Sequence, residues 1–156
     1  MEMLKRALTA GGLALLTLTL VLGVAEAKEI RVGAAINLTG PASTWGQYHA
    51  KGTQDYFRYV NEVKGGIKND KITMITVDTA YKPAEAVAAV RKFAMQEKVD
   101  MIATWGAGEG LQAKPLLQQY KIPAINYSAA WELLQPPVDY MFLPFGSYRL
   151  DCAVVM

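Results

Sequence analysis

Hydrophobic positions beyond residue 28 alternate between two spacings. Short apolar runs, β-branched in part, are typical of strands, whereas apolar residues recurring at steps of three and four are typical of helices that bury one face. The strand-like runs are residues 29–36, 71–78, 99–104, 122–126 and 140–143. The helix-like stripes cover residues 47–63, 83–94 and a third segment that ends near residue 120. Strands and helices therefore alternate along the chain.

Glycine and proline residues mark the expected ends of the helices. Gly65 and Gly66 stop the first helix, and Pro83 suits the first residue of the second. We expect the glycine-rich segment 106–110 to form a flexible turn, after which the third helix begins with Pro115 in its first turn.

This alternation with short connections predicts an α/β fold, with helices on both faces of an open parallel sheet in three layers. Ligands of such sheets bind outside the carboxyl ends of the strands. The loops at that edge are residues 37–46, 78–82, 105–110 and 127–135.

Aromatic residues gather in these loops. They include all three tryptophans of the chain and two tyrosines: Trp45, Trp105, Trp131, Tyr81 and Tyr127. An aromatic rim suits a ligand with apolar or planar parts. The alternative is that the rings cap the end of the sheet or pack on a neighbouring domain.

Two loops also offer polar groups for a ligand. Backbone N–H groups of the segment Gly106-Ala107-Gly108-Glu109-Gly110 could hold an anion where a helix begins. Its resemblance to a dinucleotide fingerprint is weak, because the third glycine is misplaced and the segment follows the third strand. Ser128 could hold a polar ligand head or could cap a helix.

Catalytic and metal-binding motifs are absent from the sequence, so we predict no catalytic residue, no metal site and no cofactor, and therefore not an enzyme. His49 is the only histidine, and at the start of a helix we expect a surface or capping residue. Asp78 ends a strand, where we expect it to orient a loop. Cys152 is the only cysteine, which excludes a disulfide framework within the chain.

The first 27 residues resemble a cleavable export signal. Lys5 and Arg6 precede an uncharged run, residues 7–24, and Ala25-Glu26-Ala27 has small residues at the cleavage positions. The alternative is a retained membrane anchor, for which the run is barely long enough. We expect a mature protein that begins near Lys28 in the periplasm.

The net charge of the sequence is +2, and it stays +2 after removal of residues 1–27, which carry two charges of each sign. Without a basic block, the sequence gives no reason to expect nucleic acid as a partner.

Four segments of the mature part are similar to type I periplasmic solute-binding proteins of ABC importers, in particular those for branched-chain amino acids. They are residues 30–46 (IRVGAAINLTGPASTWG), 61–67 (NEVKGGI), 77–87 (from Val77-Asp78 to the helix start at Pro83) and 120–130 (YKIPAINYSAA). The resemblance covers nearly all of residues 28–149.

This resemblance implies a bilobed protein that closes on a small ligand and presents it to an inner-membrane permease. Its ligand contacts would come from the loops after the first, third and fourth strands, at Trp45, Ala107, Gly108, Ser128, Ala129 and Ala130. Ala107 and Ala130 lack the hydroxyls with which amino-acid binders hold the zwitterion, so a related organic acid or amide is as plausible as an amino acid.

Members of that family are more than twice as long as this sequence. We therefore expect residues 28–145 to form the N-terminal lobe and residues 146–156 to begin the crossover to a second lobe that this sequence, apparently truncated, does not include. A ligand-sensing regulatory domain of the same fold is the alternative function.

Overall fold

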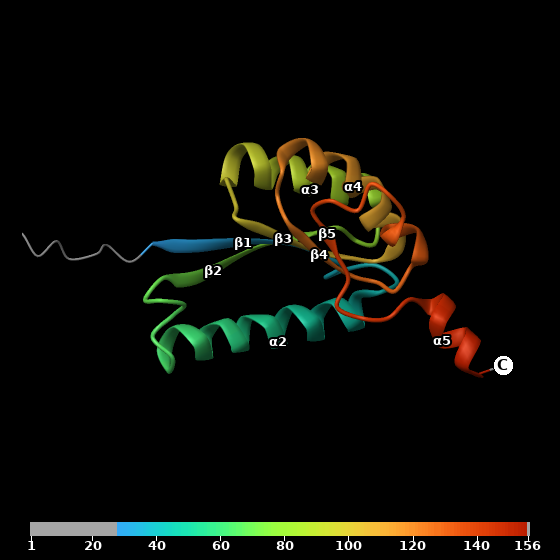
Figure 1. Ribbon diagram of the computed structural model, residues 1–156. Coiled ribbons are helices and arrows are strands. Elements are labelled where there is room, and N and C mark those ends of the chain that lie inside the picture. The colour runs from blue at the N-terminus through green and yellow to red at the C-terminus, as the bar shows by residue number, and fades with distance from the viewer. Residues whose placement is uncertain (1–27, 156) are drawn as a thin grey trace, which may run out of the picture.

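The computed structural model describes residues 28–155, which fold into a parallel sheet between two helical layers (Figure 1). The sheet has five strands in the order β2-β1-β3-β4-β5. The strands are β1 (Glu29–Ile36), β2 (Lys71–Asp78), β3 (Met101–Trp105), β4 (Ala124–Tyr127) and β5 (Met141–Phe142). The helices are α2 (Ser43–Glu62), α3 (Pro83–Lys92) with its π-helical continuation η1 (Phe93–Glu97), α4 (Ala107–Tyr120), the 3-10 helix η2 (Trp131–Leu134) and α5 (Tyr148–Val155).

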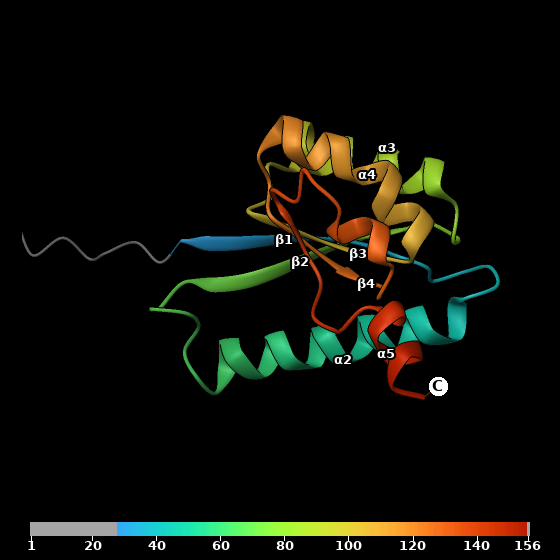
Figure 2. The same ribbon diagram turned by 45° about the vertical axis from the view of Figure 1, so that its right-hand side comes forward.

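The three-layer arrangement expected from the sequence is confirmed. Figures 1 and 2 show α3 and α4 on one face of the sheet and α2 on the other. None of the helices within residues 28–155 is long and apolar enough to cross a lipid bilayer.

The larger hydrophobic core lies between the sheet and the pair α3 and α4. Phe93, at the start of η1, is fully buried and packs on β1 at Gly33, where a β-carbon would lie only 2.7 Å from the ring. Other fully buried members of this core are Val90, Ile102, Leu117 and Leu133. The opposite face has a smaller cluster, in which Ile36 and Ala50 join α2 to β1.

Two helices begin earlier than the sequence suggested, because three glycines taken for turn residues lie inside them. α2 begins at Ser43, so that Gly46 lies in its first turns, and α4 begins at Ala107, so that Gly108 and Gly110 are helical. The reason is close packing: a β-carbon on Gly46 would lie 2.0 Å from the carbonyl oxygen of Asn37. At Gly110 it would lie 2.4 Å from the amide nitrogen of Asn126.

Pro115 consequently lies in the interior of α4, not in the first turn where we expected it. β3 and β4 also end one residue later than expected, and their register pairs Trp105 with Tyr127. This pairing places two of the predicted rim residues side by side.

The layer formed by α2 is incomplete. α2 packs against β1 and β2, and beside it a cavity of about 510 Å³ reaches the sheet at Ala103 of β3 and Ile125 of β4. Its lining is almost entirely apolar and includes Tyr56 and Phe57 of α2.

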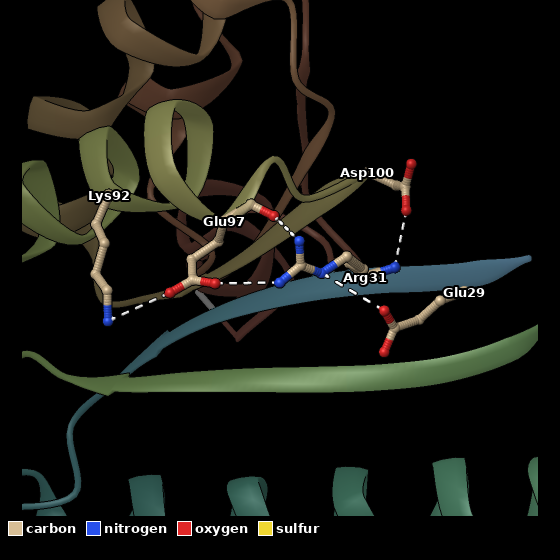
Figure 3. Close-up of polar contacts among 5 residues, drawn as sticks. All are labelled: Glu29, Arg31, Lys92, Glu97 and Asp100. Atoms are coloured by element: carbon tan, nitrogen blue, oxygen red, sulfur yellow. Dashed lines mark hydrogen bonds and ion pairs between the residues drawn. The ribbon is translucent and has the colours of Figure 1, made fainter.

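Arg31 holds the amino-terminal edge of the sheet together (Figure 3). Its guanidinium donates to the Glu97 backbone carbonyl and, at 3.1 Å, to the Glu97 carboxylate at the end of η1. Lys92 approaches the same carboxylate to 3.6 Å, and the Arg31 backbone N–H donates to Asp100 at 2.8 Å. Glu29 lies 3.8 Å from the guanidinium. These contacts join the end of η1 to β1.

The core predicts a large cost for removing the Phe93 ring. Phe93→Ala should lower the free energy of unfolding by about 3 to 5 kcal/mol, since it leaves a cavity over β1. Urea unfolding followed by circular dichroism measures this loss. Met95→Ala is the control, because Met95 is 67% exposed and only two residues away. Equal losses for the two variants would contradict the placement of Phe93.

The Arg31 contacts predict that Arg31→Met lowers the free energy of unfolding by about 1 to 2 kcal/mol, because the guanidinium and the Glu97 carboxylate are each only about one-third exposed or less. The matched control is Arg58→Met, which removes an exposed pair with Asp55 within α2 and should cost less than about 0.5 kcal/mol. The same denaturant titrations test both, and an Arg31 loss no larger than that of Arg58 would show that the cluster contributes little.

Candidate functional site

The carboxyl ends of the strands meet at one edge of the sheet, because every strand pair is parallel. The loops after β1, β2, β3 and β4 therefore lie together, at the right-hand side of Figure 1. This edge is the candidate ligand site.

Asp78 ties the first two loops together. Its carboxylate accepts from the backbone N–H of Leu38 at 2.8 Å, from that of Ala80 at 2.9 Å, and from the backbone and hydroxyl of Thr39 at 3.2 and 2.6 Å. The hydrogen bond from the Thr39 hydroxyl is the main reason that the pKa of Asp78 lies below its usual value. The loop-orienting role expected for Asp78 is confirmed.

A buried polar layer lies under these loops, with Glu109 in the first turn of α4 at its centre. Glu109 is 2% exposed, and Asn37 and Thr79 are fully buried. When the Asn37 amide nitrogen faces Glu109, it lies 3.0 and 3.1 Å from the carboxylate oxygens, and the amide oxygen accepts from Trp105 Nε1 at 3.2 Å. The Thr79 hydroxyl lies 2.6 Å from the same amide.

Burial raises the pKa of Glu109 from 4.5 to about 6. Hydrogen bonds from Thr79 and Asn37 favour the carboxylate and oppose this shift, whereas the negative charge of Asp78 adds to it. The carboxyl group therefore changes its charge near pH 6, in a position closed to solvent.

A second buried pair supports the loop after β3. The side-chain amide of Asn126 on β4 donates to the Thr104 hydroxyl at 2.8 Å and to the Gly106 carbonyl at 3.1 Å. Gly106 has a positive φ of 88°, and a β-carbon there would lie 2.8 Å from Glu109 and 2.9 Å from the Tyr81 ring. Only glycine fits this position.

An aromatic cluster lies where β3 and β4 end, on the side of the sheet that α2 covers. The rings of Trp105 and Tyr127 stack with centroids 6.2 Å apart, and Phe145 packs on Tyr127 at 6.4 Å. His49 lies 4.0 Å from Tyr127 and 5.4 Å from Trp105. The expectation of a surface or capping histidine is wrong, because His49 lies in the second turn of α2, half-buried against these rings, and burial lowers its pKa.

The residues proposed as ligand contacts occupy three kinds of position. Trp45 is 70% exposed in the first turn of α2. Ala107 and Gly108 form the first turn of α4, where Gly108 is exposed. The segment 128–130 is buried.

The buried segment is held by its own hydrogen bonds. The Ser128 hydroxyl accepts from the Ala130 N–H at 3.3 Å, and the Ala129 carbonyl accepts from the Tyr148 N–H at 2.8 Å. Ser128 thus bends the loop and does not cap η2, whose N-cap residue is Ala130.

The other predicted rim residues flank this edge. Tyr81 is 47% exposed beside Gly106, with a left-handed backbone at φ 61°. Trp131 is 40% exposed and lies 5.5 Å from the Arg149 guanidinium. Of these two residues, Tyr81 is the one that lies beside the start of α4.

Sequence analysis missed the buried polar layer as a unit. Its one signal is a polar residue at or next to the end of each of four apolar strands, namely Asn37, Thr79, Thr104 and Asn126. Glu109 gave no signal, since an acidic residue in a first helical turn is ordinary. Among residues 28–155, no group of three or more histidine, cysteine, aspartate or glutamate side chains is placed to hold a metal ion, and Cys152 is a free, exposed thiol.

Residues 29–156 match the family model described as "Periplasmic binding protein". With the parallel three-layer sheet and its ligand edge, this match shows that the chain belongs to the periplasmic binding protein family, whose members are binding proteins.

Curated and solved relatives agree with this family. The chain is 35% identical to the Leu/Ile/Val-binding protein of Citrobacter freundii over 92 residues, which are 59% of this chain and 24% of that protein. A possible leucine/isoleucine/valine-binding protein from Rhodopirellula baltica has the same fold, with a TM-score of 0.77 at 21% identity over 86% of this chain and 36% of that one.

A branched-chain amino acid ABC transporter protein from Thermus thermophilus, solved with bound valine, aligns with a TM-score of 0.69 at 27% identity. The alignment covers 83% of this chain and 35% of that one. Homologues of this chain are thus substrate-binding proteins of ABC transporters, and the chain spans about a quarter to a third of their length.

The raised pKa of Glu109 predicts a pH-dependent stability. The folded protein holds this proton more tightly than the unfolded chain, so the wild-type free energy of unfolding should lose about 1.5 kcal/mol as the pH rises from 4.5 through 6 to 7. Glu109→Gln removes this loss, and its stability relative to the wild type should rise by that amount over the same window.

Urea unfolding at intervals from pH 4.5 to 7 measures the difference. Glu85→Gln, at an exposed position in the first turn of α3, is the control and should run parallel to the wild type. Parallel curves for Glu109→Gln and the wild type would contradict a perturbed Glu109.

Proposed function

We propose that residues 28–145 form the N-terminal, ligand-binding lobe of the substrate-binding component of an ABC importer. The observation that carries this proposal is the family membership of residues 29–156. The relatives named for Leu, Ile and Val binding support amino acids or related small organic acids and amides as the ligand class. The protein then acts as a carrier and not as an enzyme.

The start of α4 offers the polar part of this site. The first N–H groups of a helix have no partner within the helix and attract anions, so the turn at Ala107 and Gly108 suits a ligand carboxylate. Gly108 is exposed at this turn, which leaves the backbone accessible. Tyr81 lies beside this turn, and Trp45, Trp105, Tyr127 and Trp131 lie at the strand ends and helix starts of the same edge, where their rings suit the apolar part of the ligand.

Ala107 and Ala130 limit which charged groups of a ligand this site can bind. Neither Ala107 nor Ala130 can give a hydroxyl to a zwitterion, and an unpartnered charge in a closed site costs several kcal/mol. Ser128, whose hydroxyl oxygen accepts from the Ala130 N–H, keeps its hydroxyl proton for donation to a ligand. A single carboxylate or amide therefore suits the site as well as a full zwitterion does.

The rest of the proposed carrier follows from the same family. We propose that residues 146–156 begin the crossover to a second lobe, and that the closed, ligand-bound form is presented to an inner-membrane permease. The incomplete α2 layer supports further chain against this lobe, because the cavity of about 510 Å³ leaves apolar residues of the sheet, such as Ala103 and Ile125, only partly covered. Val154 of α5, 87% exposed, supports it in the same way.

A ligand titration by NMR tests the proposed site. A panel of amino acids, aromatic and aliphatic acids and amides, each added at millimolar concentration, should shift the amide signals of residues 107, 108 and 128–130 and the indole signal of Trp45. Binding by residues 28–156 alone should be weaker than micromolar, because one wall of a cleft gives half of the contacts.

Ala107→Val places a branched side chain at the start of α4 and should reduce these ligand-induced shifts. The control is Ala84→Val, in the exposed start of α3, which should leave them unchanged. Shifts confined to other parts of the chain, or no shift with any compound, would refute this site.

We also propose that the protein is exported to the periplasm and cleaved after Ala27. In a Gram-negative host, intact-mass measurement of the periplasmic fraction should give a chain that starts at Lys28. Ala27→Phe should block cleavage, since the signal peptidase requires a small residue there, whereas Glu26→Gln should be processed normally. A chain that keeps Met1 in the membrane fraction would speak for an anchor.

A further inference from the structure

Three side chains form a chain of polar contacts from the interior to the rim. Glu109 is buried in the first turn of α4, Asn37 lies at the end of β1, and Trp105 ends β3 at the aromatic cluster. The Asn37 amide lies between the other two, 3.0 and 3.1 Å from the carboxylate oxygens and 3.2 Å from the indole nitrogen. If the Asn37 amide nitrogen faces Glu109, the amide oxygen faces Trp105, and if the oxygen faces Glu109, the nitrogen faces Trp105.

An ionised Glu109 requires one orientation of this amide. A carboxylate only accepts hydrogen bonds, so the amide nitrogen must face it. The amide oxygen then faces Trp105 and accepts from the indole N–H, which only donates. All three groups are satisfied, and Trp105 is anchored to β1.

A protonated Glu109 favours the other orientation. Its new O–H needs an acceptor, which the Asn37 oxygen provides when it faces the interior, where it also accepts from the Thr79 hydroxyl at 2.6 Å. The amide nitrogen then faces the Trp105 nitrogen, and two donors meet at 3.2 Å. The indole N–H loses its partner within the protein, because one donor cannot bond to another.

We propose that Glu109 is a positioning residue that anchors Trp105 through the Asn37 amide, and that this amide turns over when Glu109 gains or loses its proton. Trp105 stacks on Tyr127 at the candidate ligand edge. The charge of the buried Glu109 carboxyl group thus determines whether the Trp105 ring is held in place by a hydrogen bond. This inference goes beyond the proposed function and does not need a ligand.

Other titratable groups surround this chain of contacts. The charge that acts on Glu109 directly is that of Asp78 at the end of β2, which is ionised throughout the relevant range. His49 of α2 packs on Trp105, and burial lowers its pKa, so a test must distinguish the titration of His49 from that of Glu109. Tyr127, whose ring stacks on Trp105, is titratable as well, and burial raises its pKa. Tyr81 lies beside Gly106, the start of α3 carries the exposed Lys82 and Glu85, and Lys114 of α4 donates to the carbonyls of Leu133 and Gln135.

A ligand-free NMR titration of the purified protein tests the proposal. The Nε1–H signal of Trp105 should move with a midpoint near pH 6, whereas the indole signals of Trp45 and Trp131 should not follow it. Glu109→Gln should abolish this titration, and His49→Gln should retain it. A Trp105 signal that stays constant, or one lost in His49→Gln and kept in Glu109→Gln, would overturn the proposal.

The coupling must also work in the opposite direction. Trp105→Phe removes the indole N–H, which frees the Asn37 amide to turn its oxygen toward Glu109. The protonated form of Glu109 is then favoured, so the pKa of Glu109, followed by the NMR signal of its carboxyl carbon, should rise. Trp131→Phe is the matched control and should leave that pKa unchanged. An equal pKa of Glu109 in Trp105→Phe and the wild type would also overturn the proposal, and this arm decides it even if Glu109→Gln does not fold.

The outcome is independent of the ligand proposal. Failure of every compound to bind would leave the titration of Trp105 intact, whereas a missing titration would leave the ligand contacts at α4 standing.

Discussion

The close approach of two helix starts to the ends of neighbouring strands is the constraint on which the ligand edge depends. α2 reaches the Asn37 carbonyl because residue 46 has no side chain, and α4 reaches the Asn126 amide because residue 110 has none. Helices this close to the sheet leave polar groups at the strand ends without water. Most of those groups bond to neighbouring polar atoms: Asn37 lies within hydrogen-bond distance of Glu109 and Thr79, and the Asn126 amide nitrogen donates to Thr104 and Gly106, although Asn126 Oδ1 has no partner. The buried polar layer is thus a result of the packing.

Much of the fold could be predicted from local patterns, since the apolar runs mark β1 and β2 to the residue and the proline marks the first residue of α3. The glycines misled the prediction of α2 and α4, because a glycine needed for close approach is indistinguishable in sequence from one needed for a turn. Glu109 was beyond prediction for a similar reason. An acidic side chain in a first helical turn usually faces solvent, and only the position of α4 over Asn37 and Thr79 buries it.

The chemistry of the edge differs from what its surface residues alone suggest. The positions that face the proposed ligand carry small or aromatic side chains, and the strongly polar groups lie one layer below. The polar contacts of the proposed site would then come from the N–H groups at the start of α4 and from the Trp105 indole, whose orientation depends on the Asn37 amide. The ligand site that we propose would on this basis recognise the shape of a ligand and one anionic or amide group.

Arg31 lies near the beginning of the strand that Asn37 follows, so the guanidinium cluster and the ligand edge are separated by about 20 Å along β1. Changes that far apart, without shared partners, usually add without interference. Substitutions of the charged residues at the amino-terminal edge can therefore be used to raise the stability of the protein without altering the candidate ligand site at the opposite edge.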